Sequence, residues 1–373
     1  MKHILSSVFF IHGAIHLMGF LSGFQLARID QMPAGISRLQ AVFWLLAFLM
    51  FVLSGWAYLA GRNYWPLCTL AAVVISTFLI AGVWADARYG MPANVLLALV
   101  AVLSITSCNI QKKTGQETSR ILQAGYTANP SIVQAEDLAH LPQPVQKWLL
   151  SCGIVGKEQI YNVRVRQHAL MKMKPEQKDW YTAEALQYTT TLEPAFIWTV
   201  KMKMSPLVTV SGRDRYEDGK GHMLMRVNNL VNVVNETGEK LDQGTLQRFL
   251  GELVWMPSLA LSPYIQWQEL DENSAIATMT YKGTSGSGTF YFNERGDFVK
   301  FVALRYMGNK ADAQKLPWIL TVNDYAIFDG IKVPASMQAT WQLEQGDWTW
   351  LKLRISDLQF NVSYAERPEK VRF

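Results

Sequence analysis

The sequence predicts a membrane four-helix bundle followed by an α+β domain, in which a large curved antiparallel sheet forms a half-barrel-like meander with one main packing helix. Three observations support this fold class. Four apolar runs occupy the first third of the 373 residues, period-two alternation dominates the rest, and one amphipathic helix interrupts the alternation. Hydrophobic residues make up 50% of the chain and charged residues 17%, a composition that excludes an intrinsically disordered protein.

Charge is unevenly distributed along the chain. Residues 1–117 hold seven basic and three acidic residues, which leaves 28 basic and 27 acidic residues for the other 256. Neither part has the dense basic patch that binding to a nucleic-acid backbone requires, so no nucleic-acid partner is expected. The three cysteines are too few for a disulfide scaffold or a self-contained four-cysteine zinc site.

The apolar runs are expected to form membrane spans, because each approaches the ~20 residues with which an α-helix crosses ~30 Å of hydrocarbon. The first run resembles a signal peptide, but it ends without a small-x-small cleavage site and three runs follow, so we expect it to be retained. It contains a Gly19-x-x-x-Gly23 pair, which allows close helix approach. The runs are about Ile4–Phe24, Leu39–Ala60, Pro66–Trp84 and Pro92–Cys108, within a transmembrane domain at 1–110.

The membrane side of the C-terminal region is indicated by the positive-inside rule. With four spans, the N-terminus and the C-terminal region lie on one side. That side has five basic residues against three on the other, which favours the cytoplasm. The five are Lys2, Arg62, Lys112, Lys113 and Arg120, and the three are Arg28, Arg38 and Arg88.

Residues 111–140 are polar and are expected to be a linker, and residues 141–373 a β-rich soluble domain. Pro144 suits the first turn of a short helix at Val145–Ser151. Alternation then predicts half-buried strands separated by turns such as Asp218-Gly219, as in an antiparallel meander. The expected strands are 160–168, 185–191, 196–202, 207–216, 222–231, 265–270, 275–282, 288–293, 298–306, 318–328, 335–342 and 349–360. The Gly-rich segment 283–288 is expected to be a hairpin loop, because a strand follows it where a phosphate-binding loop would open a helix.

One helix interrupts the strands, with Asp242 as its expected N-cap and Pro257 at its end. Arg248 and Glu252 are four residues apart and are expected on its outer side. The spacing of the large apolar residues predicts one buried face, formed by Leu246, Phe249, Leu250, Leu253 and Val254.

Polar residues in or beside the membrane runs are a first set of functional candidates: His12, His16 and Asp86. The two histidines are four apart and share a helix face, a spacing that can hold a metal or a haem edge. Metal sites need three or four convergent ligands. A packing role with hydrogen bonds to neighbouring Ser or Thr is therefore favoured, and no metal site or cofactor is identified.

A second set of candidates lies in the β-rich region and is expected to bind a ligand: Arg213, Asp214, Glu252, Trp255, Arg305 and Tyr306. An arginine–carboxylate pair that faces the sheet can bind a head group or act in acid/base chemistry. The alternative is a charged network that locks helix to sheet, and it is favoured because no nucleophile–base pair is evident.

A third set is apolar. Nine tryptophans and three methionine pairs, each two residues apart on a strand, can line an adaptable cavity or fill an ordinary core. The pairs are Met171/Met173, Met202/Met204 and Met223/Met225.

Two resemblances cover nearly the whole chain. Residues 12–20, 37–40 and 84–90 resemble the DoxX-like group of small four-span bacterial membrane proteins. Residues 212–219, 252–257 and 285–290, with Arg305-Tyr306, resemble an uncharacterised bacterial membrane protein family, a domain of unknown function, that implies no catalytic residues. These resemblances imply a multi-pass protein of the bacterial cytoplasmic (inner) membrane.

The segment 329–334, Asp-Gly-Ile-Lys-Val-Pro, and the long strands after it resemble lipoprotein-carrier-like half-barrels. Such carriers hold lipid acyl chains in a concave sheet. They work outside the cytoplasm, so this resemblance and the charge count disagree about the membrane side.

Three functions follow as hypotheses. The first is an integral membrane protein whose soluble domain binds a lipid or another apolar ligand. The second is a membrane-surface enzyme or redox-linked protein that uses the four-span part. The third is a structural or assembly protein that docks a protein partner of unknown identity.

Overall fold

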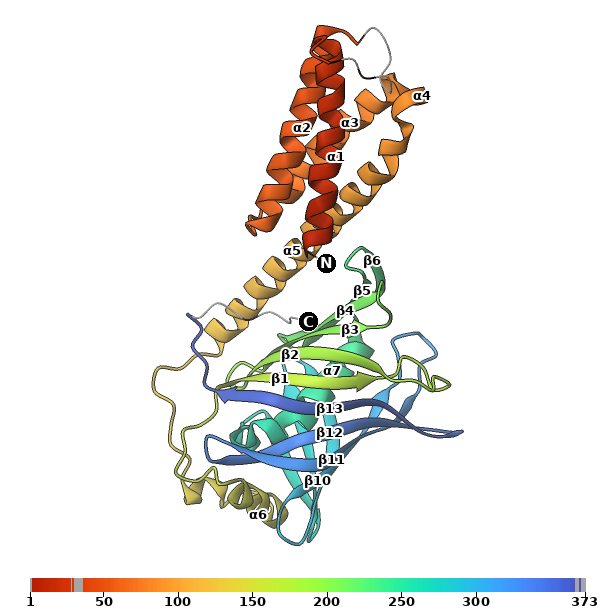
Figure 1. The fold of residues 1–373 in the computed structure, drawn as a ribbon. Coiled ribbons are helices and arrows are strands. Elements are labelled where there is room, and N and C mark those ends of the chain that lie inside the picture. The colour runs from red at the N-terminus through yellow and green to blue at the C-terminus, as the bar shows by residue number, and fades with distance from the viewer. Residues whose placement is uncertain (1, 28, 30–35, 366–368, 370–373) are drawn as a thin grey trace. The chain divides into compact units, whose positions relative to one another are not determined.

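The computed structural model describes residues 2–27, 29, 36–365 and 369 (Figure 1). The chain divides into two compact units, Met1–Ile110 and Gln111–Phe373, and each is described by itself. Arg28, one of the basic residues in the charge count, lies outside the described residues.

The first unit is helical. Four stretches, the last of which continues into the second unit, are helices long and apolar enough to cross a membrane, so the prediction of four long apolar helices is confirmed. One cluster of the first unit's buried core takes a residue from each of four helices, Phe9, Phe51, Ala72 and Leu97. The helices are α1 (Lys2–Gly23), α2 (Arg38–Leu59), α3 (Trp65–Gly82), the short α4 (Trp84–Ala87) and η1 (Arg88–Gly90), and α5 (Met91–Ala124).

Close packing of α1 on α2 depends on the Gly19-x-x-x-Gly23 pair. A Cβ on Gly19 would lie 2.3 Å from Cδ2 of Trp44, and a Cβ on Gly23 would lie 2.6 Å from Cβ of Ala41. Neither distance leaves room for a methyl group, so the glycines let the two helix backbones approach closely.

Residues 111–140, the expected linker, begin as helix. Helix α5 continues to Ala124, and the short 3₁₀ helix η2 (Ala135–Leu138) follows an irregular stretch. Helix α6 (Gln143–Cys152) comes next, with Pro144 in its first turn and Gly153 in the left-handed conformation at its end.

A single 13-stranded antiparallel sheet forms most of the second unit, in the order β6-β5-β4-β3-β2-β1-β13-β12-β11-β10-β9-β8-β7. Strand β1 pairs with β13 and so joins two meanders, β1–β6 and β7–β13. The strands are β1 (Asn162–Met171), β2 (Tyr181–Thr190), β3 (Ala195–Lys203), β4 (Thr209–Glu217), β5 (Lys220–Val227), β6 (Val231–Glu236), β7 (Ile265–Asp271), β8 (Ser274–Tyr281), β9 (Thr284–Phe292), β10 (Phe298–Tyr306), β11 (Lys315–Phe328), β12 (Ile331–Leu343) and β13 (Gly346–Phe360).

Helix α7 (Glu239–Gly251) carries the chain from one edge of the sheet to the other, followed by η3 (Glu252–Trp255) and η4 (Pro257–Leu261). It contacts β4 and β5 of one meander and β8, β9 and β10 of the other, so the sheet curls around it (Figure 1). The predicted apolar face of this helix is fully buried. The curved antiparallel sheet with one main packing helix is therefore confirmed.

Three local predictions were wrong. Helix α7 begins at Glu239 with Gly238 as N-cap, because the Asp242 carboxylate instead accepts hydrogen bonds from the Gly221 N–H and from Lys220. The expected strand 222–231 is a hairpin of β5 and β6, since Asn228 and Asn229 adopt positive φ angles of 48° and 59°.

The Gly-rich segment is also different from the expected loop. The turn is made by Lys282 and Gly283, with φ angles of 48° and 82°, which are typical of a two-residue hairpin turn. Residues 284–288 already belong to β9, where Gly288 makes room for the buried ring of Phe301.

Candidate functional site

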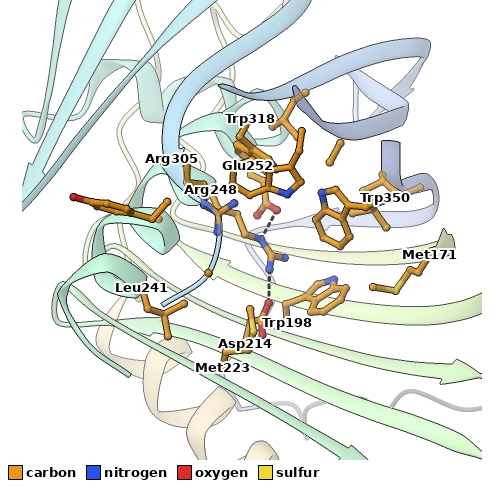
Figure 2. A pocket seen from close by; sticks show the side chains of 18 of the residues that line it. Met171, Trp198, Asp214, Met223, Leu241, Arg248, Glu252, Arg305, Trp318 and Trp350 are labelled. Carbon is orange, nitrogen blue, oxygen red and sulfur yellow. Dashed lines mark hydrogen bonds and ion pairs between the residues drawn. The ribbon is translucent and has the colours of Figure 1, made fainter. Parts of the chain in front are cut away.

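A cavity of about 290 Å³ lies within the second unit, between α7 and the inner face of the sheet. Its volume is near the lower end of the roughly 300–1,000 Å³ typical of small-molecule sites. Tryptophan and methionine dominate its wall (Figure 2). They are Trp198, Trp255, Trp318, Trp341, Trp348 and Trp350 with Met171, Met173, Met223, Met225 and Met337. Of the three predicted methionine pairs, Met202/Met204 is not in the wall, because Met202 is packed in the core and Met204 is exposed.

Five of the six candidate residues of the β-rich region line this cavity: Asp214, Glu252, Trp255, Arg305 and Tyr306. Arg213 does not. Successive side chains of a strand point to opposite faces, so Arg213 faces away from the cavity and pairs with Glu117 on the other side of β4.

A charged network at the cavity wall centres on Arg248 of α7. Its Nη1 lies 2.8 Å from Oδ2 of Asp214, and its Nε lies 2.8 Å from Oε1 of Glu252 (Figure 2). Nη2 donates to Oε1 of Gln187, whose amide nitrogen donates to the other oxygen of Glu252. Arg248 and Glu252 therefore point inward, and their expected position on the outer side of the helix was wrong.

The same guanidinium lies over two aromatic rings, 4.8 Å from the centroid of Phe196 and 4.9 Å from that of Trp198. Burial raises the pKa of the Asp214 carboxyl more than the neighbouring Arg248 and Arg305 lower it. The network ties α7 and η3 to β2 and β4, as expected of a charged lock between helix and sheet. Arg248 and Gln187 were not among the predicted site residues, although the four-residue spacing of Arg248 and Glu252 was a signal for the pair.

Arg305 of β10 enters the cavity with a different set of neighbours. Its guanidinium lies 4.6 Å from the ring centroid of Trp318 and 6.0 Å from that of Trp341. No described residue forms a hydrogen bond or an ion pair with this side chain. Burial and repulsion by Arg248 lower the pKa of Arg305 to about 10, so the group keeps its positive charge at neutral pH.

The polar candidates of the first unit also lie together. His12, His16 and Asp86 line a cavity of about 350 Å³ among the helices. His12 Nε2 lies 2.8 Å from Asn94 Oδ1, and His16 Nε2 lies 2.8 Å from Ser76 Oγ. Hydrogen bonds thus occupy the histidines as the packing interpretation expects, and no described residues form a cluster of three potential metal ligands.

Comparisons with known proteins concern mainly the C-terminal region. No curated protein matches the chain. The crystal structure of a LolA superfamily protein from Nitrosomonas europaea matches 63% of this chain and 96% of its own, with 12% identity and a TM-score of 0.31. That score is too low to support an argument about function.

These comparisons do not confirm the DoxX-like resemblance of the N-terminal region. A family model does match residues 131–353, more than half of the chain and almost the whole β-rich region. The chain belongs to DUF6544, a family of unknown function.

Proposed function

We propose that this protein is a membrane-anchored binding protein, whose β-rich domain at 141–373 holds a lipid or another apolar ligand inside the curved sheet. The observation that supports this function is the cavity of about 290 Å³ walled by six tryptophans and five methionines. Protein cores contain few voids larger than a water molecule, and flexible methionines suit a wall that adapts to ligands of different shape.

The four apolar helices supply the anchor. We place them in the bacterial inner membrane, with the β-rich domain on the cytoplasmic side as the count of basic residues favours. The bilayer would then be the source of the ligand, because the anchor and the binding domain belong to one chain.

The cavity wall supports binding more than covalent catalysis. Among its described lining residues there is no Ser, Thr, Cys or His, the groups that most often act as nucleophile or as its base. The carboxylates of Asp214 and Glu252 are already engaged by Arg248.

Photocrosslinking of the full chain in phosphatidylcholine nanodiscs tests this function. The probe is a diazirine-bearing hexadecanol, which is apolar and uncharged, and mass spectrometry of peptides locates its attachment. We expect labelling in β1 and β10–β13 around the cavity, in addition to labelling of the four apolar helices by probe in the bilayer.

A variant that fills the cavity provides the control. Leu353→Trp adds bulk at the lining and is expected to abolish the β-strand labels. Leu270→Trp makes the same change at an exposed position in β7 and is expected to leave them unchanged. Labels confined to residues 1–110 would refute the binding function, and a protein that co-purifies at fixed stoichiometry would favour the assembly role.

A further inference from the structure

We infer that the ligand of this cavity is an amphiphile whose anionic head group binds Arg305 and whose apolar body lies against the tryptophans and methionines. The inference rests on the proposed binding function and adds the chemical class of the ligand. It depends on a difference between two arginines of the cavity: Arg248 has hydrogen-bond partners in the protein and Arg305 has none among the described residues.

Arg248 and Arg305 lie in the same cavity but differ in their partners (Figure 2). Arg248 is held by Asp214, Glu252 and Gln187 through its three guanidinium nitrogens. Arg305 contacts aromatic rings, and no described side chain or carbonyl accepts a hydrogen bond from its guanidinium. The N–H donors of its terminal nitrogens are therefore available to a ligand.

Arg305 is half-buried, and a ligand that fills the cavity would take its guanidinium out of water, which is costly unless an acceptor replaces the lost hydrogen bonds. Contacts with Trp318 and Trp341 offset part of this cost, because the face of an aromatic ring attracts a cation. They supply no hydrogen-bond acceptor, however. A carboxylate or a phosphate would supply two oxygens in the paired geometry that arginine favours.

None of the three described carboxylates of the cavity forms a hydrogen bond or an ion pair with Arg305. Asp214 directs Oδ2 to Arg248, and Glu252 directs its oxygens to Arg248 and Gln187. Across the whole lining, four basic residues face three acidic ones. The basic residues are Lys172, Lys240, Arg248 and Arg305, and the acidic ones are Asp214, Glu236 and Glu252. The wall thus retains one positive charge, which an anionic head group would neutralise.

Helix α7 has a glycine, Gly244, where the Arg305 side chain packs against it. A Cβ on Gly244 would lie 2.9 Å from Nε of Arg305, closer than real side chains approach. Any other residue at 244 would push the guanidinium from its place beside Trp318. The absence of a side chain at this helix position therefore keeps the cation in the cavity.

The test compares two probes of equal chain length on the full chain in phosphatidylcholine nanodiscs. Diazirine-bearing palmitate carries a carboxylate at pH 8, and diazirine-bearing hexadecanol carries no charge. We expect palmitate to reach half-maximal labelling of the cavity peptides at a concentration at least about tenfold lower, as a charged hydrogen-bonded pair allows. A third probe, a diazirine-bearing lysophosphatidate, shows whether the preferred anion is a carboxylate or a phosphate.

Three variants assign the preference to one side chain. Arg305→Gln should remove the advantage of palmitate while hexadecanol labelling persists, which also shows that the cavity is intact. Arg305→Lys should retain part of the advantage, because it keeps the charge but loses the paired donors. Arg354→Gln changes an exposed arginine of β13 outside the cavity and should behave as the wild type.

The outcomes separate the two proposals. If neither probe labels the cavity, the binding function itself fails. If both label it equally, binding stands and the anionic head group is refuted. A palmitate advantage that survives Arg305→Gln refutes the role of Arg305.

Discussion

Arg213 and Glu117 form a buried ion pair between residues 96 positions apart, with Nη1 of the arginine 2.6 Å from both carboxylate oxygens. Their side chains are 6% and 9% exposed. The pair fastens the C-terminal part of α5 to the face of β4 that is opposite the cavity. Arg213 also donates to Nδ1 of His222, whose Nε2 lies 2.9 Å from Oδ1 of Asn235.

Breaking this pair should destabilise the β-rich unit strongly. In Glu117→Gln the arginine stays buried without its counter-charge, so we expect the free energy of unfolding to fall by about 3–5 kcal/mol. Denaturant unfolding of the full chain, followed by the circular dichroism of the sheet, measures the change. Arg120→Gln removes an exposed partner of Glu217 and should cost less than about 1 kcal/mol. Equal losses in the two variants would contradict the assignment of Glu117 as the essential partner.

Two glycine substitutions should act in opposite directions. A Cβ on Gly288 would lie 2.2 Å from Cζ of the buried Phe301, so Gly288→Ala should lower the free energy of unfolding by about 1–3 kcal/mol through overpacking. Gly115 lies within α5 and has no atom within 4 Å of its Cβ position. Gly115→Ala should therefore stabilise by roughly 0.5–1 kcal/mol, the helix-propensity difference. The same denaturant experiment checks both, and a loss in Gly115→Ala would mean that the helix is not formed there.

Local periodicity predicted much of the fold. Apolar spacing identified the membrane helices and the buried face of α7, since these depend on residues close in the chain. The N-cap of α7 was missed because the partners of Asp242 are Lys220 and Gly221, some twenty residues earlier. The inward direction of Arg248 was missed for a related reason. Two meanders curl around α7 and bury more than one side of the helix, and the local sequence of the helix does not show this.

The candidate site was predicted only in part, because it too depends on contacts between residues far apart in the chain. Alternation shows that Arg213 and Asp214 face opposite sides of β4, but it does not show which side contains the cavity. That depends on the pairing of β1 with β13, two strands that are about 190 residues apart in the chain. In this pairing Val163 lies opposite Phe360 and Met171 lies opposite Leu351.

Asp214 and Asp271 should make opposite contributions to the pH dependence of stability. Burial raises the pKa of Asp214 above its ordinary value of 3.8. The folded state then binds the proton more tightly than the unfolded chain, so the contribution of Asp214 is fully present below pH 3.8 and is lost as the pH rises through the raised pKa. Hydrogen bonds from the backbone of Asn273 and from Ser274 lower the pKa of Asp271, so its contribution is present above pH 3.8 and is lost as the pH falls through the lowered pKa.

Melting temperatures of the wild type, Asp214→Asn and Asp271→Asn on both sides of pH 3.8 test these signs. The advantage of the wild type over Asp214→Asn should shrink with rising pH, and its advantage over Asp271→Asn should grow. Parallel pH profiles for the two variants would show that the burial of Asp214 does not control its titration.

Cys152 should be almost inert to alkylation in the folded protein. Its thiol lies at the end of α6 and is 4% exposed, and burial raises its pKa to about 12. At pH 8 the thiolate fraction is then about 10⁻⁴, and the thiolate is the reactive form. Iodoacetamide labelling followed by peptide mass spectrometry should modify Cys152 only after denaturation.

The matched control for Cys152 is on the same helix. Leu150 is 57% exposed, so Leu150→Cys in a Cys152→Ser background should be labelled readily under native conditions. Labelling of Cys152 at a similar rate would mean that α6 separates readily from β8 and β12, against which it packs. It would also show an accessible thiol, which the folded structure does not offer at this position.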